Sequence, residues 1–206
     1  MNDTSIVHYS LWTTNTTKSL DAHNKTIRAW KYVFNNISDK FDWYYKADDD
    51  TYMISEKMRE FLKKYNPKEP HFFGARFKMY LKNGYNSGAG MIFSYETVRL
   101  LNEALNKDSN FCEYHVYEDL GIAQCLAKLN IFPEKTTDEN GKHRFLPYNF
   151  QEMYYNTLDA PGWLKDPIGK GFDIFSPSLV QLHHVQPNDM LLIEAMLYKV
   201  RNASDC

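Results

Sequence analysis

The spacing of apolar residues along the chain predicts helices that alternate with short strands. In residues 22–37, apolar side chains recur every three or four positions, as on a helix with one buried face. Later segments repeat this spacing, and short aromatic or aliphatic runs between them indicate strands. The predicted helices cover residues 22–37, 55–65, 94–105, 118–129 and 189–200, and the predicted strands cover residues 42–46, 71–74, 91–93 and 179–185.

Polar residues and glycines mark the predicted ends of these elements. Ser55, Ser94 and Asp189 can each accept a hydrogen bond from the first turn of a helix, so each is predicted to be an N-cap. Residues 66–67, Asn-Pro, should end the second helix. The glycine-rich segment 83–90 predicts a bend, and a plain turn is favoured over sugar or phosphate contact because its spacing matches no phosphate-binding motif.

Helices alternating with strands predict an α/β domain built in layers. We expect residues 1–206 to form a single, partial domain, with residues 1–17 as a loop or ragged end. After Pro133 the periodicity fades into turns rich in glycine, proline and aromatic residues. The segment 179–185 then predicts the last strand.

Composition excludes several classes of protein. The chain carries 24 Lys and Arg against 26 Asp and Glu, which disfavours binding of nucleic acid by general phosphate attraction. A hydrophobic content of 43% disfavours a disordered chain. No run approaches the roughly 20 apolar residues of a membrane span, and residues 1–10 lack the order of a signal peptide. We therefore expect neither an anchor nor an export signal in this sequence.

Acceptor tripeptides for N-glycosylation recur and would suit a secretory compartment, although such tripeptides are common by chance. They begin at Asn2, Asn15, Asn24, Asn36 and Asn202. Three cysteines are too few for a disulfide scaffold.

Three consecutive aspartates, Asp48, Asp49 and Asp50, follow the aromatic strand 42–46. Ligands of open α/β sheets bind beyond the carboxyl ends of strands. Alternate acids such as Asp48 and Asp50 can converge on Mg²⁺ or Mn²⁺, which then takes diphosphate oxygens as further ligands. The alternative is a solvated acidic turn. The metal site is favoured because three neighbouring carboxylates repel one another without a counterion.

Two further groups of polar residues allow a structural and a chemical interpretation. Glu118 and Asp119 begin a predicted helix, where the helix dipole alone favours acids. His183 and His184 can be packed or surface residues, although a neutral imidazole also suits Mn²⁺ beside carboxylates. From these residues alone the structural interpretation is favoured for both groups, and the chemical one stays open as the alternative.

Four motifs in this order resemble the core 1 β1,3-galactosyltransferases, which belong to the fringe-like β1,3-glycosyltransferase family. They are FDWYYKADDDTY at 41–52, FGARFK at 73–78, GYNSGAG at 84–90 and EDL at 118–120. The resemblance runs from about residue 25 to 129 and returns at 180–185. It implies a GT-A fold, the nucleotide-diphospho-sugar transferase fold, that binds Mn²⁺ and a UDP-sugar.

The resemblance also implies residue roles. Asp48, Asp50 and His183 match the metal ligands, and Asp119 matches the general base. Nucleotide contacts fall to Asp48 and Asp49, to Lys25, and to His184, which stands where the family usually has an aromatic residue. Trp163 corresponds to an aromatic residue that stacks on the acceptor sugar.

Cysteine pairing and location likewise follow from the resemblance. Cys112 and Cys125 would form a disulfide in an oxidising lumen, leaving Cys206 unpaired, with two free thiols as the alternative. Relatives of this family sit in the Golgi, carry a membrane anchor, and can form homodimers. They also carry residues before the first helix found here, so we expect the N-terminal part of the sheet to be missing.

The expected reaction is inverting transfer of galactose from UDP-galactose to N-acetylgalactosamine on Ser or Thr of a glycoprotein. One alternative is another UDP-sugar β1,3-transferase on the same framework. A second is a catalytically inactive family member that acts as a binding partner or chaperone, and a third is a plain cation-binding module.

Overall fold

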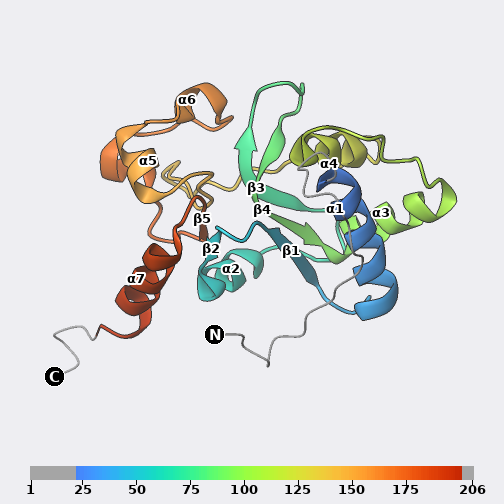
Figure 1. Ribbon diagram of the computed structural model, residues 1–206, viewed down its shortest axis with the longest axis horizontal. Helices are drawn as coiled ribbons and strands as arrows, with labels where there is room; N and C mark the ends of the chain where they lie inside the picture. Colours follow the sequence, from blue (N-terminus) through green and yellow to red (C-terminus); the bar gives the residue numbers. More distant parts are fainter. Residues whose placement is uncertain (1–21, 201–206) are drawn as a thin grey trace.

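The computed structural model describes residues 22–200, and its centre is a three-stranded antiparallel sheet (Figure 1). The sheet has the order β1–β4–β3, with β1 at Trp43–Ala47, β4 at Tyr85–Ser94 and β3 at Phe72–Phe77. A second, two-stranded sheet pairs β2, Tyr52–Met53, with β5, Gln181–Leu182. The expected mixture of helices and sheet is confirmed.

Neighbouring residues of the central strands point to opposite faces, and both faces are buried. On one face, Phe72 and Phe93 are stacked with ring centroids 5.0 Å apart, and Trp30 meets Phe93 at 4.6 Å. On the other face, Phe73 lies 5.1 Å from Phe61. The three-stranded sheet therefore has a core on each face, with β4 as its central strand.

The helices are divided between these two cores. The first core is covered by α1 (Ala22–Tyr32), its π-helical continuation η2 (Val33–Ile37), α3 (Tyr95–Lys107) and α4 (Glu118–Ala127). The second core is covered by α2 (Ser55–Leu62) together with the chain around Phe145 and Val180. The predicted helices are all present, although α2, α4 and the last helix, α7 (Pro187–Tyr198), end before the predicted residues.

Of the three predicted N-caps, only Ser94 is confirmed. Its side chain accepts a hydrogen bond from the Thr97 amide at 3.2 Å. Ser55 is already the first residue of α2, because the Ile54 amide is bound to the Val180 carbonyl at 2.8 Å and holds the extended position before the helix. Helix α7, Pro187–Tyr198, begins two residues before Asp189, since proline favours the first helical turn.

The glycine-rich segment is a strand and not the predicted bend. β4 begins at Tyr85, which pairs with Phe77, and continues through Gly88 and Gly90. The neighbouring strand β3 also needs a glycine for close packing against β4. A Cβ at Gly74 on β3 would lie 2.9 Å from the Cβ of Asn86 on β4. The turn itself lies before Tyr85, with Gly84 at a φ of +75°.

The chain after residue 133 forms short helices where the sequence predicts turns. They are α5 (Phe150–Tyr155), α6 (Ala160–Trp163) and the 3₁₀ helix η3 (Gly171–Ile174). Asn149 and Glu152 form a capping box that starts α5. The predicted strand 179–185 shortens to the two residues of β5.

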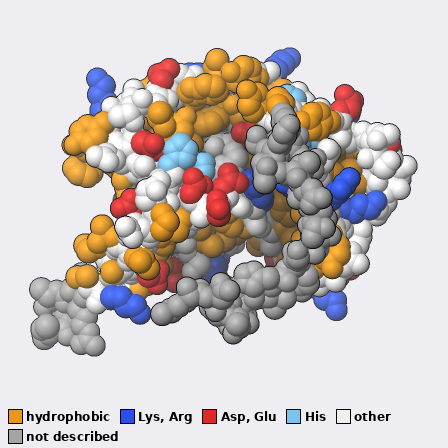
Figure 2. Space-filling view, in the orientation of Figure 1, with side chains coloured by type: hydrophobic (Ala, Val, Ile, Leu, Met, Phe, Trp, Pro, Cys, Tyr) orange, Lys and Arg blue, Asp and Glu red, His pale blue; other side chains and the backbone are white. Residues whose placement is uncertain are grey.

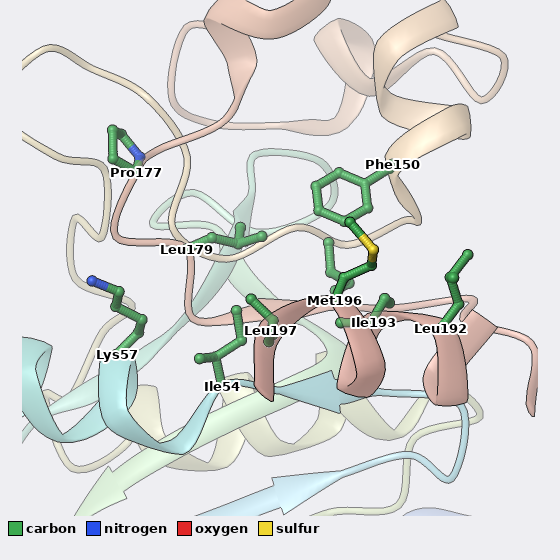
Figure 3. Close-up of a pocket in the computed structure, with 10 residues that line it drawn as sticks. Ile54, Lys57, Phe150, Pro177, Leu179, Leu192, Ile193, Met196 and Leu197 are labelled. Atoms are coloured by element: carbon green, nitrogen blue, oxygen red, sulfur yellow. The ribbon is translucent and has the colours of Figure 1, made fainter. Parts of the chain in front are cut away.

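Helix α7 lies beside α2 and encloses an apolar pocket of about 440 Å³ with it (Figure 3). Ile54, Leu179 and Met196 are among its lining residues, and Lys57 supplies the charged group there. Because no carboxylate or imidazole lines this pocket, it offers none of the chemistry that the sequence analysis singles out.

Replacing Gly74 by Ala should destabilise the fold. The new Cβ would lie 2.9 Å from both the Cβ of Asn86 and the carbonyl oxygen of Gly90, so the strands must shift. We expect the free energy of unfolding, measured in urea, to fall by about 1–3 kcal/mol. Gly88→Ala is the matched control, because its Cβ would meet no atom closer than 3.8 Å. Equal losses in both variants would contradict this packing argument.

Candidate active site

The turn between β1 and β2 carries the three aspartates. The Thr51 amide donates to the Asp48 carbonyl at 3.2 Å and closes the turn. The Val185 amide donates to the Asp50 carbonyl at 2.9 Å, and β5 pairs with β2 just beyond. These backbone bonds bring the segment that contains His183 against the aspartates, although the two are more than 130 residues apart in the sequence.

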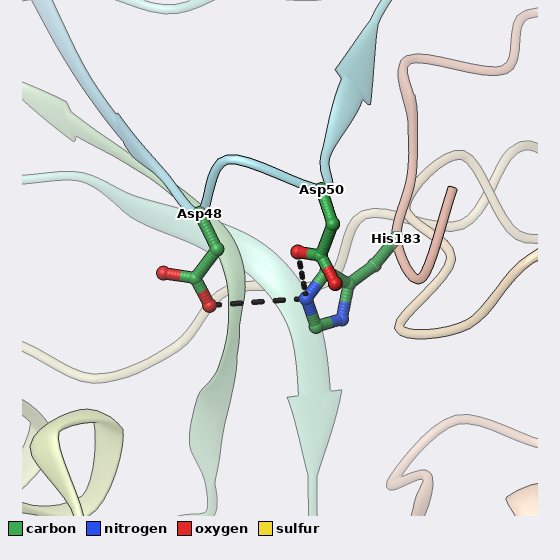
Figure 4. A group of neighbouring side chains, drawn as sticks. All are labelled: Asp48, Asp50 and His183. Carbon is green, nitrogen blue, oxygen red and sulfur yellow. Dashed lines mark ion pairs between the residues drawn. The ribbon is translucent and has the colours of Figure 1, made fainter. Parts of the chain in front are cut away.

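Asp48, Asp50 and His183 form a cluster in which one potential ligand atom from each lies within 4.8 Å of the others (Figure 4). The His183 Nε2 atom is 2.9 Å from Asp50 Oδ1 and 3.8 Å from Asp48 Oδ2. Figure 2 shows acidic side chains and a histidine gathered on this face of the molecule. The structure thus brings together the three residues that the sequence analysis assigns to a metal.

The hydrogen bonding of His183 suits a metal ligand. Its Nδ1 atom is 3.0 Å from the Pro147 carbonyl oxygen, which only accepts, so Nδ1 carries a proton. In the neutral ring, Nε2 then presents a lone pair toward two carboxylates. Such a contact requires a proton or a cation between the groups, and two carboxylate oxygens with one imidazole nitrogen are a donor set for a divalent ion.

Glu118 and Asp119 begin α4, with Tyr117 at the N-cap position. Burial raises the pKa of both carboxyl groups. The Oδ1 atom of Asp119 accepts the Leu120 amide at 2.8 Å, so Asp119 also bonds its own helix. The helix-start interpretation and the chemical one therefore both remain compatible with its position.

Gly88 on β4 separates the aspartate cluster from the acids of α4. A Cβ at Gly88 would lie 3.8 Å from Asp48 Oδ2, 3.9 Å from the Asp119 Cβ and 3.9 Å from Glu118 Oε2. All three side chains thus line the same small space beside a residue without a side chain. One of the predicted metal ligands, Asp48, and the predicted base, Asp119, therefore lie beside the same residue.

Lys46 is a residue of this site that the sequence analysis missed. Its Nζ atom donates to Asp48 Oδ1 at 2.6 Å, to the Gly88 carbonyl at 3.0 Å and to Glu118 Oε2 at 3.3 Å. Burial works against its charge, but Glu118 and Asp48 outweigh it and raise the Lys46 pKa. The sequence did contain one indication of this role. Lys46 stands two residues before Asp48 in an extended segment, which places both side chains on the same face of the strand.

The remaining predicted site residues lie outside the three-residue cluster. Asp49 is exposed on the turn and is not part of the three-residue group among residues 22–200. The His184 ring centroid is 4.5 Å from that of His183, but its Nδ1 atom bonds Glu152 at 3.0 Å, on α5. Lys25 is half-buried on α1.

Trp163 ends α6 and packs against the β3–β4 hairpin. Its ring centroid lies 5.9 Å from those of Phe77 and Tyr80. The Trp163 carbonyl also accepts the Lys78 amide at 2.9 Å, which fixes α6 to the end of β3. Contacts with the β3–β4 hairpin thus hold Trp163 in place.

The disulfide between Cys112 and Cys125 is confirmed, with Cα atoms 4.9 Å apart. It ties the segment before α4 to the body of that helix. The two acids at positions 118 and 119 lie between the bonded cysteines, so the bond restrains the loop that presents them. Cys206, predicted to be unpaired, lies outside the described residues, as do the acceptor residues Asn2, Asn15 and Asn202.

No helix in residues 22–200 combines the length and apolar character needed to cross a membrane.

Comparison with known proteins identifies relatives along most of the chain. The chain is 30% identical to glycoprotein-N-acetylgalactosamine 3-beta-galactosyltransferase 1 from Xenopus laevis over 185 residues, 86% of this chain and 51% of that protein. It is 27% identical over 190 residues to human beta-1,3-glucosyltransferase, covering 84% of this chain and 37% of the relative. Human chondroitin sulfate synthase 3 is 26% identical over 165 residues, 72% of this chain and 17% of that protein.

The chain therefore spans about half the length of the Xenopus relative and less of the human ones. The model of the Fringe-like family matches residues 1–137, well over half of the sequence. This match agrees with the family resemblance carried by the motifs. The chain belongs to the Fringe-like family.

Proposed function

We propose that this protein is a metal-dependent inverting glycosyltransferase with a GT-A fold that uses a UDP-sugar as donor. The observation that carries the proposal is the shared space at Gly88, where Asp48 of the ion cluster and the buried base candidate Asp119 meet. The names of the relatives, two of them 1,3-linking transferases, support the reaction class. Asp48, Asp50 and His183 would hold the ion, which we propose is Mn²⁺.

Each side chain has a role that its position permits. When bound, the ion would offset the negative charge that develops on the departing diphosphate. Asp119 would accept the proton of the acceptor hydroxyl as that oxygen attacks the anomeric carbon. The bond from that carbon to the UDP oxygen breaks with its electron pair leaving on UDP, so attack from the opposite face inverts the centre. Burial helps Asp119, because the raised pKa makes it a stronger base.

The finer assignments extend this proposal. We assign UDP-galactose as donor and N-acetylgalactosamine on Ser or Thr of a glycoprotein as acceptor. The Xenopus relative's name, a 3-beta-galactosyltransferase of glycoprotein N-acetylgalactosamine, supports this pair of sugars. Asp49, Lys25 and His184 would contact the nucleotide, and Trp163 would stack on the acceptor sugar. The disulfide suits an oxidising lumen, and we propose the Golgi.

Calorimetry should show that UDP binds only when Mn²⁺ is present. Asp50→Ala should weaken Mn²⁺ binding on the order of 100-fold or more and abolish the coupled UDP binding. The substitution removes the carboxylate oxygen that lies beside the His183 Nε2 atom and is proposed to bind the ion with it. The control is Asp39→Ala, which removes an exposed carboxylate elsewhere and should change neither affinity. Mn²⁺ binding without any effect on UDP would favour a plain cation-binding module.

Asp119→Asn should leave Mn²⁺ and UDP binding in place and lower the turnover number by about 10²–10⁴, the usual contribution of a general base. Transfer would be followed as UDP release with a GalNAc-bearing peptide. Glu113→Gln, an exposed acid between the same two cysteines, is the matched control and should keep wild-type turnover. Wild-type turnover in the Asp119 variant would remove this residue from the role of base.

The turnover number should also fall in acid with a midpoint above the ordinary range of an aspartate. A base acts only when ionised, and burial raises the pKa of Asp119, so protonation begins at a higher pH than the usual value of about 4. The measurement is turnover against pH at saturating donor and acceptor. A midpoint at or below about pH 4 would contradict this environment for the base.

A further inference from the structure

The Lys46 side chain joins three segments that are far apart in the sequence. Its Nζ atom donates hydrogen bonds to Asp48 on the aspartate turn, to the Gly88 carbonyl on β4 and to Glu118 on α4. An ammonium group has three hydrogens, so these three acceptors use all of its donors. The side chain is only 20% exposed, which fixes it among these partners.

At the first end of this connection, Lys46 sets the direction of the Asp48 carboxylate. Oδ1 is held by the ammonium at 2.6 Å, whereas Oδ2 faces the His183 Nε2 atom at 3.8 Å. Figure 4 shows one oxygen of Asp48 directed toward His183 and the other directed away. A group that bonds the outer oxygen of a ligand orients the inner one, as in other metal sites.

At the second end, Lys46 holds the residue that precedes Asp119. The Glu118 side chain is 10% exposed, and its Oε1 atom is buried without a partner in residues 22–200. A carboxylate with one unpaired oxygen depends strongly on the charge at its other oxygen. Here that charge is the ammonium at 3.3 Å.

The ammonium also lies between carboxylates that would otherwise repel one another. Glu118 Oε2 and Asp48 Oδ2 both flank Gly88, at 3.9 and 3.8 Å from the position of a Cβ there. Without a positive charge between them, these two carboxylates would repel each other, and one acid would move away from the other. The loss of Lys46 would therefore displace either the ion ligand or the start of α4.

We propose that Lys46, together with Glu118, is a positioning bridge that holds Asp48 ready for the ion and holds the start of α4 so that Asp119 faces the same space. This inference rests on the proposed function for the role of Asp119, whereas its effect on Asp48 concerns ion binding alone. In this proposal Lys46 acts through its two acidic partners and is not itself a ligand of the ion.

The first test measures Mn²⁺ affinity by calorimetry in the full chain. Lys46→Met keeps most of the side-chain length without the charge and should lower Mn²⁺ affinity about 10- to 100-fold. Lys46→Arg keeps the charge and should restore affinity to within about fivefold of wild type. The control is Lys57→Met, a lysine paired with Glu60 on α2, which should bind Mn²⁺ as the wild type does. Wild-type affinity in Lys46→Met would overturn the bridge.

The second test is a double-mutant cycle on turnover. Glu118→Gln should lower the turnover number about tenfold in the wild-type background, with little change in KM for the donor, because it loosens the start of α4. In the Lys46→Met background the same change should add less than about twofold, since the bridge is already broken. An undiminished loss in that background would show that the two residues act independently and would contradict the proposal.

The two tests separate this inference from the proposed function. Ion affinity is compared without turnover, so a chain that binds Mn²⁺ and transfers no sugar would contradict the transferase while the affinity series still decides the role of Lys46. Conversely, active transfer with unchanged affinity in Lys46→Met would retain the transferase and remove the bridge. If Lys46→Met does not fold by circular dichroism, Lys46→Gln, which also removes the charge, takes its place in both tests.

Discussion

The candidate site depends on the short pairing between β2 and β5. Tyr52 opposes Leu182, and the Val185 amide bonds the Asp50 carbonyl at 2.9 Å. This antiparallel contact fixes the late segment of the chain against the end of β1, and His183 consequently stands 2.9 Å from Asp50. A chain lacking this pairing would keep both the aspartate turn and the histidine and would have no cluster.

The close approach of strands is the second requirement. Gly74 allows β3 to pack against Asn86, and Gly90 leaves space for Tyr45 and Gln181, whose side chains are hydrogen-bonded at 3.0 Å. Gln181 is fully buried two residues before His183. The glycines of β4 therefore serve the packing that aligns β5, and Gly88 keeps the space between the acids open.

Much of this arrangement could be predicted from the sequence. The helices with a clear 3.6-residue period were predictable, as was the Ser94 cap, because a long buried stripe leaves few other solutions. The aspartates and His183 could be assigned through the family motifs, although proximity across more than 130 residues is not visible in local patterns. The family resemblance supplied what periodicity could not.

The errors have physical causes. The segment 83–90 was predicted as a bend because glycine is typical of turns, whereas here it permits close strand contact. Helices of four to six residues, such as α5 and α6, are too short to show a period. Lys46 was missed because a lysine in a strand is ordinarily solvent-exposed, and its three acceptors come from segments that only the fold assembles.

The bond between Cys112 and Cys125 gives the two halves of the site different sensitivity to their surroundings. The candidate ion ligands lie on the β1–β2 turn and beyond β5, outside the 13-residue span that the cysteines close. Asp119 lies inside it. In a reducing environment the segment that carries Asp119 would gain conformational freedom, whereas the backbone bond that holds Asp50 near His183 does not depend on the disulfide. The redox state of the two cysteines would thus set how firmly one side of the candidate site is held.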